Sequence, residues 1–203
     1  NKYTPDRTTT NPARTSLAQQ REKVSRKFAK LTPLRGTGAE GYLKGRGINS
    51  LPVESIRYCD KQPVDGKNLQ AIYALATDDK GELCYLHRTL LDGEKKAQTG
   101  GTAKKMMKLQ EDNYLEYAKS VAIRLFPVAS TLGIAEGIET ALSCHQITKC
   151  NTWATMNTAF MKKFRVPAGV KNLIIFADAD ANAAGHAAAM VCAEANLHAK
   201  NDL

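Results

Sequence analysis

The feature that most constrains the fold is an alternation of short strand-like and helix-like segments that begins at about residue 114. Residues 172–177 (NLIIFA) form a continuous apolar run and predict the most buried strand, and residues 152–156 (TWATM) predict another. Residues 138–148 and about 183–197 have the apolar spacing of helices. Strands and helices that alternate with short connections indicate an α/β fold, with a Rossmann-like parallel sheet flanked by helices.

The first 126 residues predict a smaller α+β unit. Ser16 is the expected N-cap of an amphipathic helix that ends before Pro33. The other expected elements are short helices at 39–46 and 157–164, a helix at 114–125, a hairpin of strands 69–76 and 83–90, and a short strand at 104–109. The expected organisation is a disordered lead or linker over 1–15, a basic N-terminal subdomain over 16–126, and an α/β domain over 127–203.

The net positive charge is confined to residues 1–126. The chain carries 29 Lys and Arg against 20 Asp and Glu, a formal net charge of +9. Residues 1–126 hold 23 of these basic and 14 of these acidic residues, whereas residues 127–203 hold six of each. A basic segment joined to a neutral one that carries carboxylates is typical of an enzyme acting on a polyanion, although a solvated basic surface without a partner has the same composition.

Composition also narrows the class of protein. The five cysteines are an odd number with no C-x-x-C spacing, which argues against a disulfide framework and a zinc ribbon. No segment approaches the roughly 18 apolar residues of a membrane span. The expectation is therefore a cytoplasmic protein that has no membrane partner.

Acidic side chains follow two of the predicted strands. Glu136 follows a short apolar run that ends at residues 133–135, and Asp178 and Asp180 follow the apolar strand at 172–177. Functional groups of open α/β sheets lie beyond the carboxyl ends of the strands, and carboxylate oxygens suit Mg²⁺ or Mn²⁺. The two aspartates are also the residue type that caps a following helix, so a purely structural role is the alternative.

The segments around these acidic residues resemble a known protein family. The segments GIAEGIETAL (133–142) and NLIIFADADANAAGHAAA (172–189) resemble the Toprim domain shared by bacterial-type primases, type IA and II topoisomerases and certain nucleases. Preceded by GTGAEGYLKGRGI (36–48), YLHRTLLDG (85–93) and KKMMKL (104–109), they resemble the DnaG-like primases of phages and conjugative plasmids.

The resemblance implies a role for each acidic residue. Glu136 falls on the Toprim glutamate, which acts as a general acid or base or assists metal binding in that family, and Asp178 and Asp180 fall on the metal-binding D-x-D. Such primases often have an aspartate where this chain has Thr140, so Glu139 either supplies that charge as a further metal ligand or points outward from the helix start. The family sheet usually continues after the next helix, which implies a truncated C-terminus.

The resemblance also implies substrates and partners. It predicts metal-dependent synthesis of short RNA primers from ribonucleoside triphosphates on a single-stranded DNA template, and it leaves a replicative helicase open as a further partner. Candidate contacts to template or triphosphate are basic residues, each of which could instead be a solvated side chain: Lys104, Lys105, Lys108, Arg88 and Arg46. A Toprim nuclease and a non-catalytic nucleic-acid-binding module remain alternatives.

Overall fold

A single mixed sheet runs through the protein in the computed structural model, which describes residues 16–52, 54–179 and 183–201. The strands of the described part are β1 (Ile56–Val64), β2 (Lys67–Thr77), β3 (Leu83–Asp92), β4 (Lys95–Lys96), β5 (Lys104–Lys108), β6 (Ala122–Ile123), β7 (Thr131–Ala135), β8 (Asn151–Ala154) and β9 (Asn172–Phe176). The helices are α1 (Leu17–Lys30), α2 (Gly38–Lys44), α3 (Asp112–Tyr117), α4 (Ile138–Thr148), α5 (Thr158–Lys162) and α6 (Ala184–Asn201). The expected lead over 1–15 lies outside the described residues.

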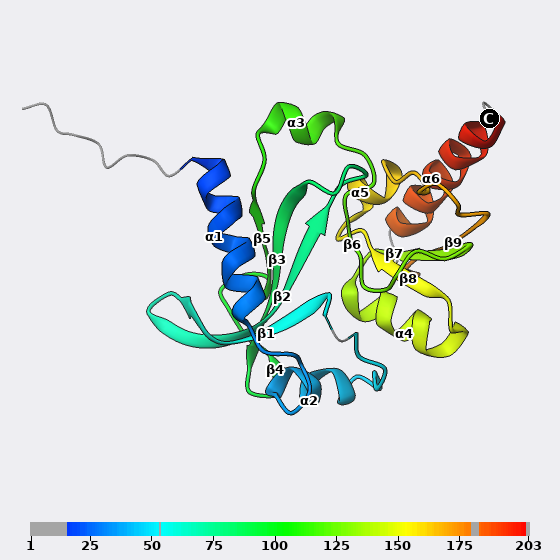
Figure 1. Cartoon of the computed structure of the whole chain (residues 1–203). Helices are drawn as coiled ribbons and strands as arrows, with labels where there is room; N and C mark the ends of the chain where they lie inside the picture. The colour runs from blue at the N-terminus through cyan, green and yellow to red at the C-terminus, as the bar shows by residue number, and fades with distance from the viewer. Residues whose placement is uncertain (1–15, 53, 180–182, 202–203) are drawn as a thin grey trace, which may run out of the picture.

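The N-terminal part is built on antiparallel strands. β2 and β3 form the predicted hairpin, with β1 beside β2 and β5 beside β3. α1 begins with a capping box in which Ser16 and Gln19 bond each other's backbone, and it lays Val24 and Phe28 on the sheet. Figure 1 shows α1 along this sheet and far from α6.

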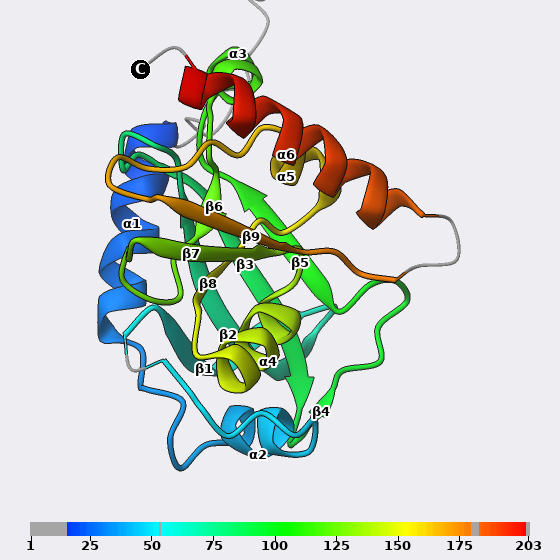
Figure 2. The same ribbon diagram turned by 90° about the vertical axis from the view of Figure 1, so that its right-hand side faces the viewer.

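The C-terminal part is parallel, as predicted. β7 lies between β8 and β9 and pairs with both in parallel register. The short helix α5 begins at Asn157, whose side chain accepts from the Phe160 backbone N–H. Figure 2 shows α4 and α6 packed beside this part of the sheet, and the expectation of an α/β fold with a parallel sheet and flanking helices is confirmed.

The short strand β6 joins the two parts. It pairs antiparallel with β2 on one side and with β8 on the other. Backbone hydrogen bonds therefore run without a break from the basic part to the part that carries the acidic motifs. The boundary expected near residue 126 falls just after β6, and the division into separate domains stays a prediction.

Three details differ from the sequence-based expectation. The helix expected over 114–125 is wrong beyond Tyr117, because Ser120 exchanges hydrogen bonds with Arg165 and the buried residues that follow pair as β6. Within the described part of the chain, β9 is an edge strand that pairs with β7 alone, and it is not the most buried strand, since Ile174 is 39% exposed. The strand β1 was not predicted from the sequence.

Among the described residues, no helix is long and apolar enough to span a bilayer.

Candidate active site

Glu136 and Asp178 leave the sheet at the same edge. Ala135 and Phe176 are register partners on β7 and β9, so the residues that follow them lie side by side beyond the strand ends. Both acidic residues are half-buried. We call this pair the acidic edge. Asp180, the third predicted member, lies outside the described residues.

Helix α4 contributes a hydroxyl to the acidic edge. Thr140, on its first turn, donates from Oγ1 to Oδ1 of Asp178 over 3.5 Å. α6 approaches from the other direction, because a Cβ on Gly185 would lie only 2.8 Å from the Asp178 carbonyl oxygen. Among the described residues no three His, Cys, Asp or Glu side chains are grouped as metal ligands. Asp178, Glu136 and Thr140 nevertheless offer only oxygen donors, the chemistry that suits Mg²⁺ or Mn²⁺.

Glu139 turns away from the acidic edge and into the N-terminal part. Its Oε1 accepts from the Tyr42 hydroxyl at 2.9 Å and lies 3.3 Å from Lys96 Nζ, while its Oε2 lies 3.2 Å from Lys104 Nζ. These four residues, the Glu139 cluster, join α2, β4, β5 and α4. Glu139 is 7% exposed, so it does not point outward, and its assignment as a metal ligand stays a prediction.

The lysines keep Glu139 ionised despite its burial. Burial by itself raises the pKa of Glu139, but the Lys104 and Lys96 ammonium groups and the Tyr42 hydroxyl outweigh it and bring this pKa down to about 2. Burial and the Glu139 carboxylate together raise the pKa of Tyr42 far above its ordinary value. The cluster is therefore a carboxylate held between two cations and a hydroxyl donor.

A buried histidine lies next to this cluster. His87 on β3 is 5% exposed, and its Nδ1 has no hydrogen-bond partner among the described residues. Burial first, and then the positive charge of Lys104, lower the pKa of His87 to about 4. His87 is thus a neutral ring packed beside charged groups at neutral pH.

The five basic residues predicted to contact template or triphosphate lie in different parts of the structure. Lys104 lies at the start of α4, where a Cβ on Gly137, the residue after Glu136, would lie 3.5 Å from its Nζ. Arg88 and Lys105 are register partners on β3 and β5, one position along from the Thr89–Lys104 pair, so they leave the opposite face of the sheet. Lys108 is exposed and pairs with Asp112, and Arg46 is exposed just after α2.

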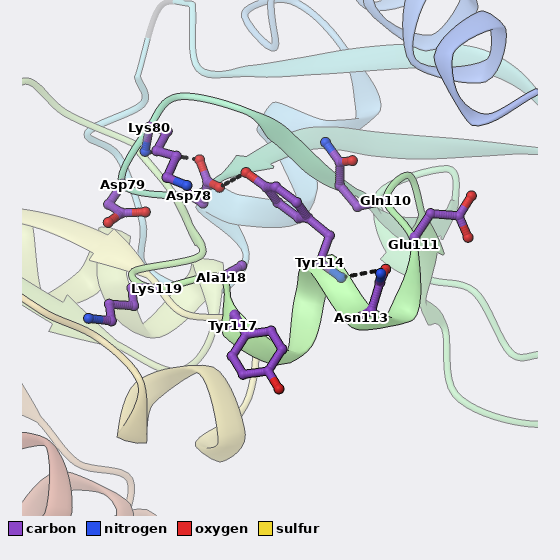
Figure 3. Close-up of a pocket in the computed structure, with 10 residues that line it drawn as sticks. All are labelled: Asp78, Asp79, Lys80, Gln110, Glu111, Asn113, Tyr114, Tyr117, Ala118 and Lys119. Carbon is purple, nitrogen blue, oxygen red and sulfur yellow. Dashed lines mark hydrogen bonds between the residues drawn. The ribbon is translucent and has the colours of Figure 1, made fainter.

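A separate hollow lies where the β2–β3 turn meets α3. It has a volume of about 670 Å³, and Figure 3 shows its lining residues around Asp78 and Tyr114. The Tyr114 hydroxyl donates to Asp78 Oδ2 at 2.5 Å, and the backbone N–H groups of Lys80 and Glu82 donate to Oδ1. Asp78 is fully engaged in holding the turn against α3, which makes it a structural residue.

Three members of the site were not singled out from the sequence. Tyr42 lies inside the quoted segment 36–48, whereas Lys96 lies between the quoted segments 85–93 and 104–109. His87 lies inside the quoted segment 85–93, next to the predicted basic residue Arg88. Their shared contact is made by tertiary packing, and no local spacing signals it.

Comparison with known families agrees with the geometry of the acidic edge. Residues 131–201 match the Toprim domain family, so this part of the chain has the features of a Toprim domain. Residues 18–115 match a family described as a domain of unknown function (DUF7146). The two matches lie on either side of β6.

Among solved structures, the chain is similar to the crystal structure of the primase fragment of the bacteriophage T7 primase-helicase protein. The two are 14% identical with a TM-score of 0.40, over 79% of this chain. This chain spans 57% of the length of that fragment. A search of curated protein sequences found no match.

Proposed function

We propose that this chain is the catalytic core of a DNA primase, which synthesises short RNA primers on single-stranded DNA for a phage, plasmid or other mobile element. The observation that carries the proposal is the position of Lys104. The N-terminal part delivers its ammonium group to the start of α4, where it pairs with Glu139 and borders Gly137, the residue that follows Glu136 in the chain. Carboxylates for a metal and a cation for a triphosphate are thus supplied by two different parts of one sheet.

The chain's residues have separable roles in this proposal. Asp178, with Asp180, would hold the metal, and Thr140 would orient Asp178 through its hydroxyl. Bound Mg²⁺ or Mn²⁺ neutralises triphosphate charge and lowers the pKa of the attacking 3′-hydroxyl. Glu136 would accept or return a proton, and Lys104 would position the triphosphate, since nucleotidyl transfer depends on positioning and charge stabilisation.

A ribonucleotide incorporation assay on single-stranded DNA tests the proposal. With Mg²⁺ and labelled ribonucleotides, the chain should make short labelled products, and Asp178→Asn and Glu136→Gln should each abolish them. Asp65→Asn is the matched control, because Asp65 lies in the β1–β2 turn at a φ of 48° that asparagine also adopts. Shortening of labelled DNA without incorporation would instead identify a Toprim nuclease and overturn the primase proposal.

A further inference from the structure

A row of positive charges crosses the N-terminal sheet on the face that carries α1. Arg57 on β1 is the register partner of Tyr73 on β2, Tyr73 is the partner of Arg88 on β3, and Arg88 is the partner of Lys105 on β5. Register partners in antiparallel strands leave the same face of a sheet. Arg57, Arg88 and Lys105 therefore form a line across four strands, the cation row, and all three are half-buried.

Helix α1 extends this charge. Lys27 Nζ donates to the Tyr73 hydroxyl at 3.0 Å and lies 5.0 Å from the centre of the Tyr73 ring. A helical stripe of exposed basic residues follows at spacings of three and four: Lys23, Arg26, Lys27 and Lys30. A groove of about 770 Å³ runs along these side chains. From Lys23 to Lys30 the stripe is about 10 Å long at the rise of an α-helix.

Arg26 of the basic stripe is paired with Glu22, whereas three other cations of this surface have no acidic partner among the described residues. Within the part of the chain that the structure describes, Lys27, Arg88 and Lys105 make no salt bridge, and Arg88 Nε is buried without a hydrogen-bond partner. Like charges directly opposite each other destabilise a sheet, so the protein alone bears a cost that an anion would offset. Lys104, on the opposite face, differs because it forms a salt bridge with Glu139, a carboxylate that it shares with Lys96.

We propose that the cation row and the basic stripe of α1 form a second nucleic-acid surface, which binds the phosphate backbone of single-stranded DNA on the sheet face opposite the Glu139 cluster. Cations repeated along a helix and across strands suit a polyanion with regularly spaced charges better than one small anion. The inference goes beyond the proposed function because it assigns a binding surface and requires no chemistry at the acidic edge.

The test measures binding of a fluorescent 20-nucleotide oligothymidylate to the full chain by anisotropy, over a range of salt concentrations with EDTA and without nucleotides. Arg88→Gln and Lys105→Gln are combined in one variant. Each lost phosphate contact should flatten the plot of log affinity against log salt by about 0.7, so the double variant should lose about 1.4 units of slope. Its affinity at 0.1 M salt should fall roughly 10- to 30-fold.

A second double variant, Lys162→Gln with Lys171→Gln, removes the same net charge from exposed positions in the C-terminal part and should keep the wild-type slope. Equal slopes in the wild type and the Arg88/Lys105 variant, or equal losses in both double variants, would overturn the proposal. The Arg88/Lys105 variant should melt no lower than the wild type, because its substitutions relieve like-charge repulsion. The proposal would also be overturned if the Arg88/Lys105 variant lost affinity for inorganic phosphate but kept the wild-type slope of log DNA affinity against log salt. The surface would then bind a small anion and not the DNA backbone. Failure of primer synthesis would leave this result standing, since the measurement contains neither metal nor nucleotide.

Discussion

Lys104 Nζ lies 3.2 Å from Glu139 Oε2, and this contact connects the basic part of the chain to the first turn of the Toprim helix α4. Glu139 is buried, whereas the Lys104 side chain is 41% exposed and borders Gly137. One side of the lysine is thus fixed by a carboxylate while the other remains open to a ligand. The same carboxylate holds Lys96, so two cations are fixed by one acidic residue.

Replacing Glu139 by glutamine should destabilise the protein. The substitution keeps the shape of the side chain but leaves two ammonium groups without their carboxylate. Because both lysines are partly hydrated, we expect a loss of about 1–3 kcal/mol in the free energy of unfolding at pH 7, below the full cost of breaking a buried pair. Chemical denaturation measures this, with Glu22→Gln as control, since Glu22 pairs with Arg26 at the exposed surface of α1.

The Glu139 contribution has a defined pH window. Its pKa is lowered in the folded protein to about 2, so the stabilisation is complete above the ordinary value near 4.5 and disappears as the pH falls towards 2. The difference between wild type and Glu139→Gln should therefore shrink over that range. A difference that stays constant from pH 7 to pH 3 would contradict the ion-pair origin of the effect.

Most elements of the fold were predictable because their signals are local. Ser16 with Gln19, and Asn157 ahead of α5, cap helices through contacts within a few residues, and the hairpin turn at Asp78 bonds its own backbone. β6 was missed because its two residues gain their conformation from pairing with Thr77 and Ala154, which the local helical pattern does not reveal. Tertiary pairing outweighed local propensity there.

The candidate site was predictable only in part, for a related reason. Glu136 and Asp178 follow strands, so their common edge follows from parallel pairing. The partners of Glu139 are distant, since Tyr42 lies 97 residues away along the chain. Arg88 and Lys105 lie on one face of the sheet and Lys104 on the other because of the strand register. A register shift of one residue would exchange these faces.

His87 should make the fold sensitive to mild acid. Its pKa is lowered by burial and by Lys104 to about 4, so between pH 6.5 and 4 the unfolded chain binds a proton that the folded chain does not. This residue should therefore reduce the free energy of unfolding by about 3 kcal/mol as the pH falls across that window. In His87→Gln this pH-dependent loss in the free energy of unfolding should vanish. His186→Gln, which replaces an exposed histidine, should lose as much stability between pH 6.5 and 4 as the wild type. Parallel pH profiles for wild type and His87→Gln would rule out this contribution.

Gly133 should be essential to the packing of the strand that carries Glu136. A Cβ at this position would lie 2.5 Å from Thr152 Oγ1 and 2.9 Å from the Phe176 ring, so the side chains of these two residues, on β8 and β9, would have to shift. Gly133→Ala should cost about 1–3 kcal/mol in the free energy of unfolding, as overpacked cores do. Gly100→Ala, where no atom lies within 4 Å, is the control, and thermal melting compares the two. Equal melting temperatures would show that the sheet relaxes around the added methyl group.

Thr140 offers the sharpest test of the acidic edge. Its hydroxyl donates to Asp178, and it stands where the resembled primases often carry an aspartate. Thr140→Asp adds a carboxylate beside Asp178, so like-charge repulsion should lower the melting temperature of the metal-free protein. A metal ion bound at Asp178 would be held more tightly by the extra charge, and Mg²⁺ should then raise the melting temperature more in the variant than in the wild type.

Thr140→Asn is the matched control, because it has nearly the shape of aspartate without its charge. Mg²⁺ titration calorimetry on Thr140→Asp, Thr140→Asn and wild type, with Asp178→Asn as a further variant, should rank affinity in the order aspartate variant, wild type, Asp178→Asn. If Mg²⁺ binds Thr140→Asp and wild type alike, the metal does not lie at Asp178 and the acids at these strand ends serve the helices that follow them. If the affinity gain persists when Asp178→Asn is added to Thr140→Asp, the new carboxylate has built a site of its own.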